Sequence, residues 1–437
     1  MIVIYCDNIT SRLQYIVKTL FGIDVTLRSC AEKQADENFP IIDYTQAKFS
    51  PASVWIRPHA LLFQDDISTQ NIECFEWNGL KAFFKTSGDI SFDIFAASFY
   101  LITRYEEYLP HILDKYGRYV HTNSLAFRED FLQLPLINLW LAEFSTLLQH
   151  KPPAFNLQSS TFNLQLSTFS FLSTYDIDIA YAYKHHSLIQ TAGGYLKDLI
   201  TGKWNQLAHP SNVFLGSKKD PFDIYEWLHE LNDKYNLKPV YFFLVAETRK
   251  GYDKNLSPHT EGIKNLIRQH AAKYAIGIHP SWQSNTDEKI LQHEIELLDE
   301  ITNSKIENSR QHYIKLKFPE TYRALIKQGI KNDYSMGYGS INGFRASYCL
   351  PYQWFDLKKN EQTGLMIHPF CYMDANSFFE QHYSAQQAAE ELQHYYDIVK
   401  KVNGKLITIF HNHFLTEQSQ WLPWRRMYED FLRKNFL

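Results

Sequence analysis

The sequence predicts an α/β protein, namely a (β/α) barrel of about seven strands preceded by a smaller α/β or α+β domain. In the second part of the chain, apolar runs of β-branched and aromatic residues alternate with stretches of helical periodicity, which is typical of a largely parallel sheet. The break Lys151-Pro152-Pro153 and the Ser/Thr/Gln-rich tract after it separate this part from the first. We therefore predict domains over residues 1–150 and 169–437, joined by a linker at 151–168.

The predicted N-terminal domain begins with an apolar run that indicates a strand. Apolar side chains from Phe92 onward recur at helical spacing, and Pro135 stands where the first turn of another helix tolerates it. We expect the charges of Arg104, Glu106 and Glu107 to form a solvated or structural ion cluster and not a catalytic one. The predicted elements are strand 1–7, a helix through 15–20, strand 53–56, and helices 92–105 and 135–148.

The predicted C-terminal domain contains most of the secondary structure. Strands are expected at 169–175, 240–245, 275–279, 306–310, 329–335, 365–369 and 406–411. Helices are expected at 221–235, 287–301, 319–328 and 385–402. In a β/α barrel the side chains that carry chemistry follow the C-terminal ends of the strands, so those positions are the place to look for a site.

Composition excludes several classes of protein. The 437 residues carry a formal net charge of -4 without a basic stripe, so we expect no nucleic-acid partner. No uncharged apolar run approaches about 18 residues, so we expect no membrane span. The five cysteines are scattered and lack Cys-x-x-Cys spacing, which argues against a disulfide framework or a thiolate zinc site. This cysteine pattern, and a start too short and acidic for a signal peptide, predict a reducing, cytoplasmic location.

Asp176 and Asp178 end the apolar run that begins at Phe169. Burying an unpaired carboxylate is costly, so two of them at the end of a buried strand need a partner. Residues two apart on a strand point to the same side, and both carboxylates can therefore face one site. Such a pair suits one metal ligand beside one general base. The simpler alternative is an Asp-x-Asp that caps the next turn or helix.

Polar side chains recur at the ends of the later predicted strands. His279 and His411 each close an apolar run, Arg310 and His312 follow another, and Asp333 lies near the end of a further one. Taken singly, each has an ordinary alternative, such as a core histidine, a surface salt bridge or a turn cap. Arg310 could also hold a buried carboxylate by a bidentate bond, which orients it and lowers its pKa. Their recurrence at strand ends favours one site at the mouth of a barrel.

The order of these residues resembles the polysaccharide deacetylase family (NodB-homology, carbohydrate esterase 4-like) over about residues 168–437. The motifs that carry the resemblance are Tyr175-Asp176-Ile177-Asp178, His279-Pro280-Ser281-Trp282-Gln283, Arg310, Asp333 and His411. The resemblance implies that Asp176 is the base and that Asp178 and His279 bind the metal. It also implies that Arg310 lies near the base, that Asp333 orients Arg310 and the acid, and that His411 protonates the leaving amine.

The chain departs from the family pattern in three motifs, and in one of them Gln311-His312 replaces the usual residues after Arg310. One residue separates the two aspartates, and Gln283 stands where the family has the second histidine of a His-x-x-x-His metal motif. Glutamine is a poor zinc ligand beside imidazole. His312 follows the neighbouring predicted strand and is our candidate for the third ligand. Segments 92–100 and 104–108 resemble the uncharacterised domain that precedes deacetylase-like domains in some bacterial proteins, which implies no known activity.

We therefore expect a metal-dependent hydrolase that removes an N-acetyl or similar acyl group from a sugar or glycan, with a divalent cation, zinc first among them, on Asp178, His279 and His312. Aromatic rings are expected to stack on the carbohydrate, among them Trp282, Tyr338 and Trp354. The alternative, motivated by Gln283, is an inactive deacetylase-like barrel that binds glycan or acts as a scaffold. A third interpretation is an enzyme that modifies a nucleotide-bound sugar, but the sequence contains no Gly-rich phosphate loop that would support it.

Overall fold

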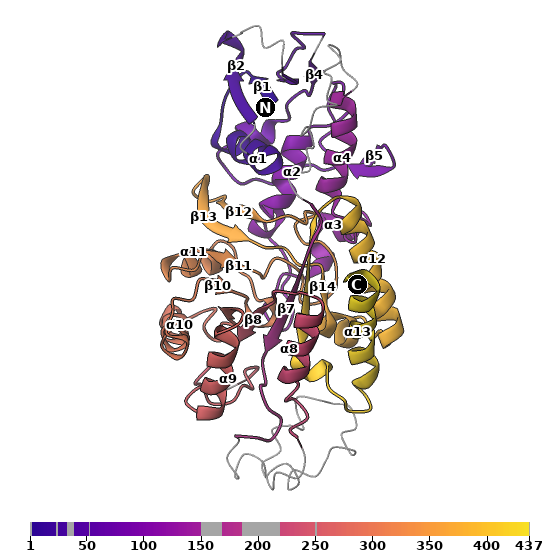
Figure 1. The fold of residues 1–437 in the computed structure, drawn as a ribbon. Helices are drawn as coiled ribbons and strands as arrows, with labels where there is room; N and C mark the ends of the chain where they lie inside the picture. The colour runs from indigo at the N-terminus through magenta and orange to yellow at the C-terminus, as the bar shows by residue number, and fades with distance from the viewer. Residues whose placement is uncertain are drawn as a thin grey trace.

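The computed structural model describes residues 2–22, 25–32, 39–51, 53–149, 168–185, 219–249 and 251–436. We refer to the described residues up to 149 as the N-terminal unit and to those from 168 onward as the C-terminal unit. The two units lie end to end, with the N-terminal unit at the top of Figure 1. Most of the predicted linker, residues 151–167, lies outside the described residues, and the predicted domain boundaries stay a prediction.

Four parallel strands form the sheet of the N-terminal unit, in the order β2-β1-β3-β4. They are β1 (Ile2–Cys6), β2 (Val25–Ser29), β3 (Ile41–Tyr44) and β4 (Val54–Trp55). Helix α1 (Ser11–Phe21) joins β1 to β2 and buries Leu13, Ile16 and Leu20 at helical spacing. The Thr10 side chain caps this helix by accepting a hydrogen bond from the Leu13 amide. The strand predicted at 1–7, the helix through 15–20 and the strand at 53–56 are thus confirmed.

Helix α2 (Ile94–Ile102) is the helix predicted at 92–105, shortened at both ends. The Asp93 carboxylate caps its start, because it accepts hydrogen bonds from the amides of Phe95 and Ala96, each 3.0 Å long. Every residue of α2 is buried, so the helix is a core element and has no solvent face. Arg104 follows in a left-handed conformation (φ 53°) and turns the chain into the 3-10 turn Tyr105–Tyr108. The unit also contains β5 (Phe75–Trp77), β6 (Leu80–Ala82), α3 (Leu125–Arg128) and α4 (Leu136–Gln149).

A nine-stranded sheet forms the centre of the C-terminal unit, in the order β12-β13-β11-β10-β9-β8-β7-β15-β14. All neighbours in this sheet pair in parallel except β12 and β13, which are antiparallel. The strands are β7 (Ser170–Ile177), β8 (Val240–Phe243), β9 (Ala275–Ile278), β10 (Asn308–Ser309), β11 (Asn332–Asp333), β12 (Tyr352–Asp356), β13 (Glu361–Ile367), β14 (Tyr372–Met373) and β15 (Lys405–His411). The seven predicted strands are present, and β12 and β14 are additional.

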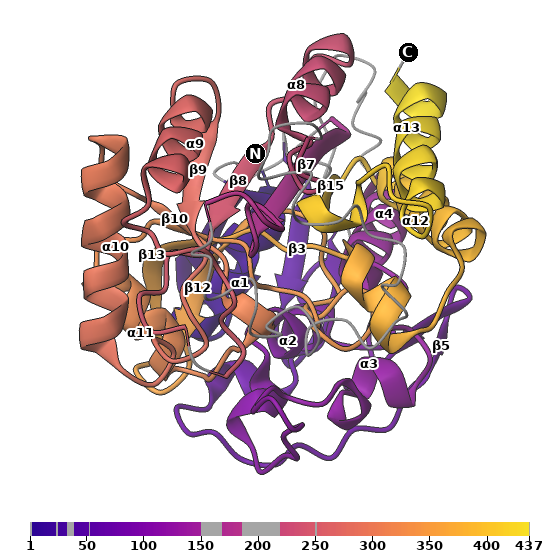
Figure 2. The same ribbon diagram turned by 90° about the horizontal axis from the view of Figure 1, so that it is seen from below.

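The parallel strands follow one another around the sheet in chain order, as they do in a β/α barrel. Closing the barrel would require β13 to pair with β14, and this pair is not among those of the described residues. The structure therefore shows a mixed α/β unit with a large, mainly parallel sheet, and closure stays a prediction. Figure 2 looks along this unit and shows helices arranged around the outside of β7, β8 and β15.

These outer helices match the four predicted ones and add two. The predicted set corresponds to α8 (Tyr225–Lys234), α10 (Glu288–Thr302), α11 (Glu320–Lys327) and α12 (Ala385–Lys401). The additional two are α9 (Glu261–Ala271) and α13 (Leu422–Phe436). Among the described residues, no helix combines the length and the apolar character that crossing a membrane requires.

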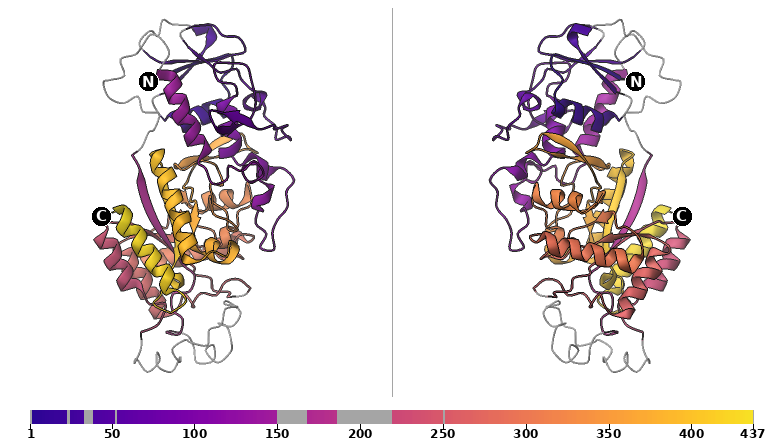
Figure 3. Two further views of the ribbon diagram at one scale, coloured as in Figure 1. Left: turned by 90° about the vertical axis from the view of Figure 1, so that its right-hand side faces the viewer. Right: turned by 90° about the vertical axis from the view of Figure 1, so that its left-hand side faces the viewer.

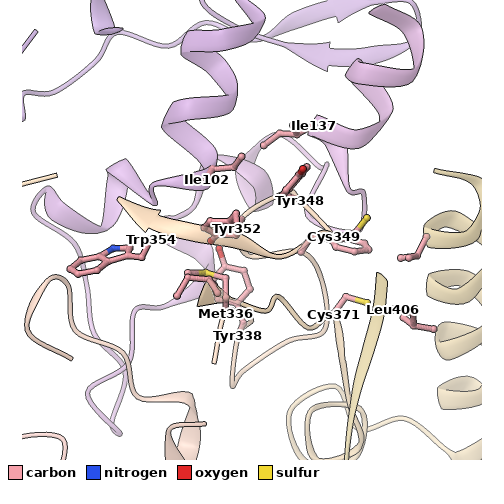
Figure 4. Packing of buried hydrophobic residues seen from close by; sticks show 14 of the residues in the cluster. Ile102, Ile137, Met336, Tyr338, Tyr348, Cys349, Tyr352, Trp354, Cys371 and Leu406 are labelled. Atoms are coloured by element: carbon pink, nitrogen blue, oxygen red, sulfur yellow. The ribbon is translucent and has the colours of Figure 1, made fainter. Parts of the chain in front are cut away.

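One hydrophobic core continues from the N-terminal unit into the C-terminal unit. Figure 4 shows Ile102 and Ile137 of the first unit above Tyr348 and Tyr352 of the second. The charged cluster predicted at Arg104, Glu106 and Glu107 lies at the same boundary, but it is buried and not solvated. Glu107 receives hydrogen bonds from the side chains of Arg104 and Arg345, and Arg345 belongs to the C-terminal unit. The cluster therefore has a structural role and joins the two units.

Candidate metal centre

The parallel register brings the predicted site residues to one edge of the large sheet. His411 at the end of β15 is paired with Asp176 at the end of β7, and Asp178 follows two residues later. Ile278 of β9 is paired with Ser309 of β10, so that His279 and Arg310, the next residue of each strand, are also neighbours. Carboxyl ends of parallel strands meet at one edge, and the side chains beyond them can therefore converge.

Asp178, His279 and His312 form a compact group. One ligand-type atom from each lies within 4.8 Å of the others. The Nε2 atom of His279 is 3.2 Å from Asp178 Oδ1, and the Nε2 atom of His312 is 3.7 Å from Asp178 Oδ2. Within the described residues, Asp178 Oδ1 is buried and accepts no hydrogen bond. A buried carboxylate oxygen that lies beside an imidazole nitrogen without a hydrogen bond, with a second imidazole at the other oxygen, is the arrangement that a shared cation would satisfy.

Both imidazoles are held from the side opposite Asp178. His279 Nδ1 lies 2.6 Å from the carbonyl oxygen of Arg310, which can only accept, so Nδ1 carries the proton. His312 Nδ1 lies 2.8 Å from the carboxylate of Asp253, which fixes that ring in the same way. Each ring therefore turns Nε2 toward Asp178. This pairing of a histidine with a carbonyl or a carboxylate is typical of metal-binding histidines.

The electrostatics of the group are dominated by burial and by the opposite charges. Burial raises the pKa of Asp178, but His312 and His279 outweigh it and hold that pKa well below its usual value. Burial lowers the pKa of His312, but the carboxylates of Asp178 and Asp253 raise it to about 10. A proton and a divalent cation compete for the same Nε2 atom, and cation binding would release that proton.

Asp176 lies beside this group and is held by Arg310. Arg310 Nη1 donates to Asp176 Oδ1 (2.8 Å) and to Thr174 Oγ1 (2.6 Å). The guanidinium also donates from Nε to the carbonyl oxygen of Tyr334 and lies over the ring of Phe242, 4.3 Å from its centroid. Arg310 is therefore fixed by its surroundings and, in turn, orients Asp176. The second oxygen of Asp176 faces His279 Nε2 at 3.9 Å.

His411 is paired with a carboxylate that the sequence did not single out. His411 Nδ1 lies 2.6 Å from Asp374 Oδ1, and the His411 amide donates to Asp374 Oδ2 (2.7 Å). His411 Nε2 faces the site, 3.7 Å from Asp178 Oδ2. Burial lowers the pKa of His411, but Asp374 and the site carboxylates raise it to about 9, so this imidazole is held in its protonated, donor form.

Asp333 is buried behind the site. Its carboxylate accepts hydrogen bonds from the hydroxyls of Ser309 and Ser335, 2.8 and 2.9 Å long. Burial raises the pKa of Asp333. Ser309 directly precedes Arg310 in the chain, and the Ser335 hydroxyl accepts from the Gln311 amide. Asp333 therefore supports the backbone on either side of Arg310, and its predicted role in orienting that residue would be exercised through this backbone.

Gln283 and His368 do not join the group of Asp178, His279 and His312. The side-chain amide of Gln283 donates from Nε2 to the carbonyl oxygen of Thr248 (3.0 Å), and His312 supplies the second imidazole of the group. His368, which has the same strand-end form as His279, is stacked on Tyr334 and faces Asn332 Oδ1 at 3.0 Å. Burial lowers the pKa of His368 to about 3, so it is a neutral core histidine.

Partly exposed aromatic rings lie next to His312. Trp282 is 5.3 Å from Tyr252 between ring centroids, and Tyr252 is 5.2 Å from Tyr313. Tyr116, from the N-terminal unit, stacks on Tyr313 at 5.0 Å. The other two rings predicted to stack on carbohydrate, Tyr338 and Trp354, are 1% and 2% exposed and lie inside the shared core (Figure 4). Buried rings cannot stack on a ligand, so the expectation is wrong for these two residues.

Asp253 and Asp374 are the functional candidates that sequence reasoning missed. Asp374 directly follows β14, a strand of two residues that is too short to be recognised by its pattern. Asp253 lies in the irregular segment between β8 and α9, where an aspartate most often indicates a turn. A possible signal was that an imidazole that binds a metal or transfers a proton needs a second partner for its other nitrogen.

Comparison with known proteins gives one family match and several distant structural ones. The model of a family of unknown function (DUF7033) matches residues 2–153. No curated protein matches the chain in sequence. A probable polysaccharide deacetylase from Pseudomonas aeruginosa PAO1 is 12% identical, with 61% of this chain and 85% of that chain covered and a TM-score of 0.41. A polysaccharide deacetylase from Bacillus cereus is 10% identical (61% and 88% covered, TM-score 0.30). A CE4 family pseudoenzyme from Bacillus anthracis is 8% identical (62% and 62% covered, TM-score 0.32).

Proposed function

We propose that the protein is a metal-dependent hydrolase that removes an acetyl or similar acyl group from a nitrogen atom of a sugar or glycan. The observation that carries the proposal is the convergence of Asp178, His279 and His312. Asp178 Oδ1 is buried without a hydrogen bond and lies 3.2 Å from His279 Nε2, Asp178 Oδ2 lies 3.7 Å from His312 Nε2, and the other nitrogen of each imidazole is occupied. The proposal includes closure of the large sheet into a β/α barrel with this group at its C-terminal rim.

These three residues suit a divalent cation, and zinc in particular. Two imidazole nitrogens and one carboxylate oxygen are a ligand set that zinc accepts in hydrolytic sites, where a further position stays open. A cation held there would supply a bound water of lowered pKa. No cysteine takes part, so the nitrogen and oxygen donors of Asp178, His279 and His312 decide the affinity.

The residues around the group have separate roles in this reaction. Asp176, oriented by Arg310 (2.8 Å), would take the proton of the attacking water as general base. His411 would donate a proton to the departing nitrogen as general acid, and the carboxylate of Asp374 holds its ring in place (2.6 Å). A base and an acid on two neighbouring strands, with the cation ligands beside them, are the parts that amide hydrolysis requires.

The aromatic rings beside His312 support a carbohydrate substrate. Trp282, Tyr252 and Tyr313 are partly exposed, and the Tyr252 ring contacts the other two rings at a tilt, with interplanar angles of 59° and 58°. Such rings bind the apolar faces of sugars while their polar tips stay hydrated. Lys315 Nζ lies 3.7 Å from the centroid of Trp282, which fixes the ring on one side.

Elemental analysis and acetate release test the proposal together. Protein purified without chelator should contain about one divalent cation per chain and release acetate from N-acetylglucosamine oligomers. Asp178→Ala and His279→Gln should lose both properties. His270→Gln is the matched control, because it removes a buried histidine of α9 whose Nδ1 lies 2.8 Å from the carbonyl oxygen of Leu266, outside the site. A wild-type protein without cation and without acetate release would contradict the proposal.

The inactive, glycan-binding barrel is the second outcome of this experiment. It would be favoured if oligomers bind without acetate release and if binding survives both chelation and Asp176→Asn. Its original motivation was Gln283, but His312 supplies an imidazole to the group where that residue does not. The geometry therefore supports hydrolysis better.

A further inference from the structure

A short hairpin of the N-terminal unit reaches the C-terminal unit next to the candidate metal centre. An isolated bridge between Leu113 and Tyr119 defines its base, and Gly117 (φ 75°) forms part of its turn. Figure 3 shows a purple segment of the N-terminal unit that extends along the side of the C-terminal unit. The hairpin carries two side chains to this contact, Tyr116 and Arg118.

Arg118 is the centre of the contact. Its Nη1 atom donates to the carbonyl oxygens of Tyr313 (3.4 Å) and Gly339 (2.5 Å), both in the C-terminal unit. Its remaining nitrogens bind the carboxylates of Asp114 (2.6 Å) and Glu380 (3.3 Å). The guanidinium is 7% exposed and lies over the ring of Tyr116, 4.6 Å from its centroid. A planar fork that is fixed on three sides is a rigid support.

Arg118 supports the residue that directly follows a proposed metal ligand. Tyr313 comes after His312 and has φ 59°, and Ile314 has φ 54°. Two successive side-chain-bearing residues in the left-handed region are unfavourable, and a β-branched isoleucine is especially so. Such a turn persists only where its surroundings hold it. The contacts that hold it include the bond from Arg118 to the Tyr313 carbonyl and the stacking of Tyr116 on the Tyr313 ring.

Gly339 shows that this contact is closely fitted. A Cβ atom at this position would lie 2.8 Å from the Tyr313 carbonyl oxygen and would collide with Nη1 of Arg118. The backbone at Gly339, the guanidinium and the turn after His312 therefore meet where only a glycine fits. Arg118 and Gly339 therefore both contact the backbone that directly follows His312.

We propose that Arg118 is a positioning residue for His312. The N-terminal unit would then contribute to cation binding by supporting one of the ligands. This inference rests on the proposed function, since it requires that His312 binds the cation. It assigns a role to a unit whose matching family has no known function. Arg118 acts through the backbone of Tyr313, to whose carbonyl oxygen it donates a hydrogen bond (3.4 Å).

Cobalt binding by the full-length protein tests the inference without using activity. Arg118→Ala should lower the Co²⁺ affinity about tenfold, the lower end of the range for residues that orient a metal ligand, and change the visible absorption of the bound ion. Arg118→Lys keeps the charge but loses the fork, so it should restore the affinity only in part. Gly339→Ala, which alters no charge, should weaken binding as well.

Arg12→Ala is the matched control. Arg12 is also a buried arginine of the N-terminal unit, and its Nε donates to Asn360 of the C-terminal unit (2.9 Å), in the turn between β12 and β13. It should leave the Co²⁺ affinity and spectrum unchanged. The inference is overturned if Arg118→Ala or Gly339→Ala binds Co²⁺ like the wild type, or if Arg12→Ala weakens binding as much as Arg118→Ala. A wild type that binds no Co²⁺ would overturn the proposed function itself, which separates the two failures.

Discussion

The protein contains two buried charged clusters, and they are built on different principles. At the boundary between the units, Glu107 Oε1 accepts hydrogen bonds from Arg104 Nε (2.7 Å) and Arg345 Nε (2.8 Å). At the candidate metal centre, Asp178 faces three imidazoles, whose Nε2 atoms lie 3.2, 3.7 and 3.7 Å from its oxygens. The first cluster consists of direct bonds. The second places donor atoms around a common point without joining them.

The completeness of the hydrogen bonding distinguishes a charged cluster that stabilises the fold from one that could bind a ligand. A buried ion pair offsets its desolvation only if its bonds are short and complete, as they are at Glu107. Arg345 and Arg104 outweigh the effect of burial and lower the pKa of Glu107, so the pair stays ionised. The Asp178 side chain is 19% exposed, against 2% for Glu107, but its Oδ1 atom is buried and accepts no hydrogen bond within the described residues. Incomplete satisfaction of a buried carboxylate is costly, and a cation is the simplest group that would remove that cost.

The strongest test of this comparison removes one carboxylate charge from each cluster and measures both stability and cation binding. Glu107→Gln should lower the free energy of unfolding by about 3–5 kcal/mol, because it leaves the buried Arg345 without a carboxylate, and it should leave cation binding intact. Asp178→Asn should do the reverse: it removes cation binding and changes the unfolding free energy in chelator by less than about 1 kcal/mol. Urea unfolding and elemental analysis of both variants measure this.

An exposed pair provides the control for that experiment. Asp430 and Arg433 are 61% and 65% exposed and 2.7 Å apart, so Asp430→Asn should cost less than about 1 kcal/mol. If Glu107→Gln were no more costly than Asp430→Asn, the cluster at the boundary would not stabilise the protein as its geometry indicates.

The second prediction concerns the pair at the edge of the metal centre. Asp374→Asn should lower kcat for acetate release about 10²–10³-fold, because an amide in place of the carboxylate no longer favours the protonated ring of His411. Cation content and KM should be close to those of the wild type. A loss of cation together with rate would show that Asp374 supports the ligands and not the proton donor.

The ligands of the candidate metal centre could be predicted from the sequence, but the residues that support them could not. Asp178, His279 and His312 were predicted because each follows a strand, and the parallel register brings such positions together whatever the loops do. Asp253 lies in an irregular segment, and its bond to His312 depends on a loop path that no periodicity predicts.

The same limit explains the failures. The amphipathic spacing of a strand or helix predicts that a ring is apolar and ordered, but not whether it faces a cleft or the core. Trp354 lies in β12, an antiparallel strand at the sheet edge that packs against the N-terminal unit, and it is therefore buried. The role of Arg118 could not be predicted either, because its partner Tyr313 is distant in sequence and the contact crosses two units.

A third prediction uses the cation as a ligand of the folded state only. At a free Zn²⁺ concentration of about 100 times its Kd, the wild type should gain about 2.7 kcal/mol of unfolding free energy. Glu107→Gln should show the same gain from a lower starting point, because its metal ligands are unchanged. Asp178→Asn should show none. A gain that is equal in all three proteins would indicate binding elsewhere, and thermal melts at several Zn²⁺ concentrations measure it.

The smallest effect is expected at Asp253, where only the support of a ligand changes. Asp253→Asn keeps an oxygen that can accept from His312 Nδ1 but removes the charge that raises the pKa of this ring. Zn²⁺ affinity, measured by competition with a chelating dye, should fall about tenfold, or about 1.4 kcal/mol. Asp356→Asn is the matched control, since it removes a buried carboxylate bound to Arg323 (2.7 Å) outside the site and should not change the affinity. If Asp253→Asn bound Zn²⁺ like the wild type, the charge of Asp253 would not be needed to orient His312. The metal centre would then differ from the Glu107 cluster, in which we expect the loss of one carboxylate charge to be costly.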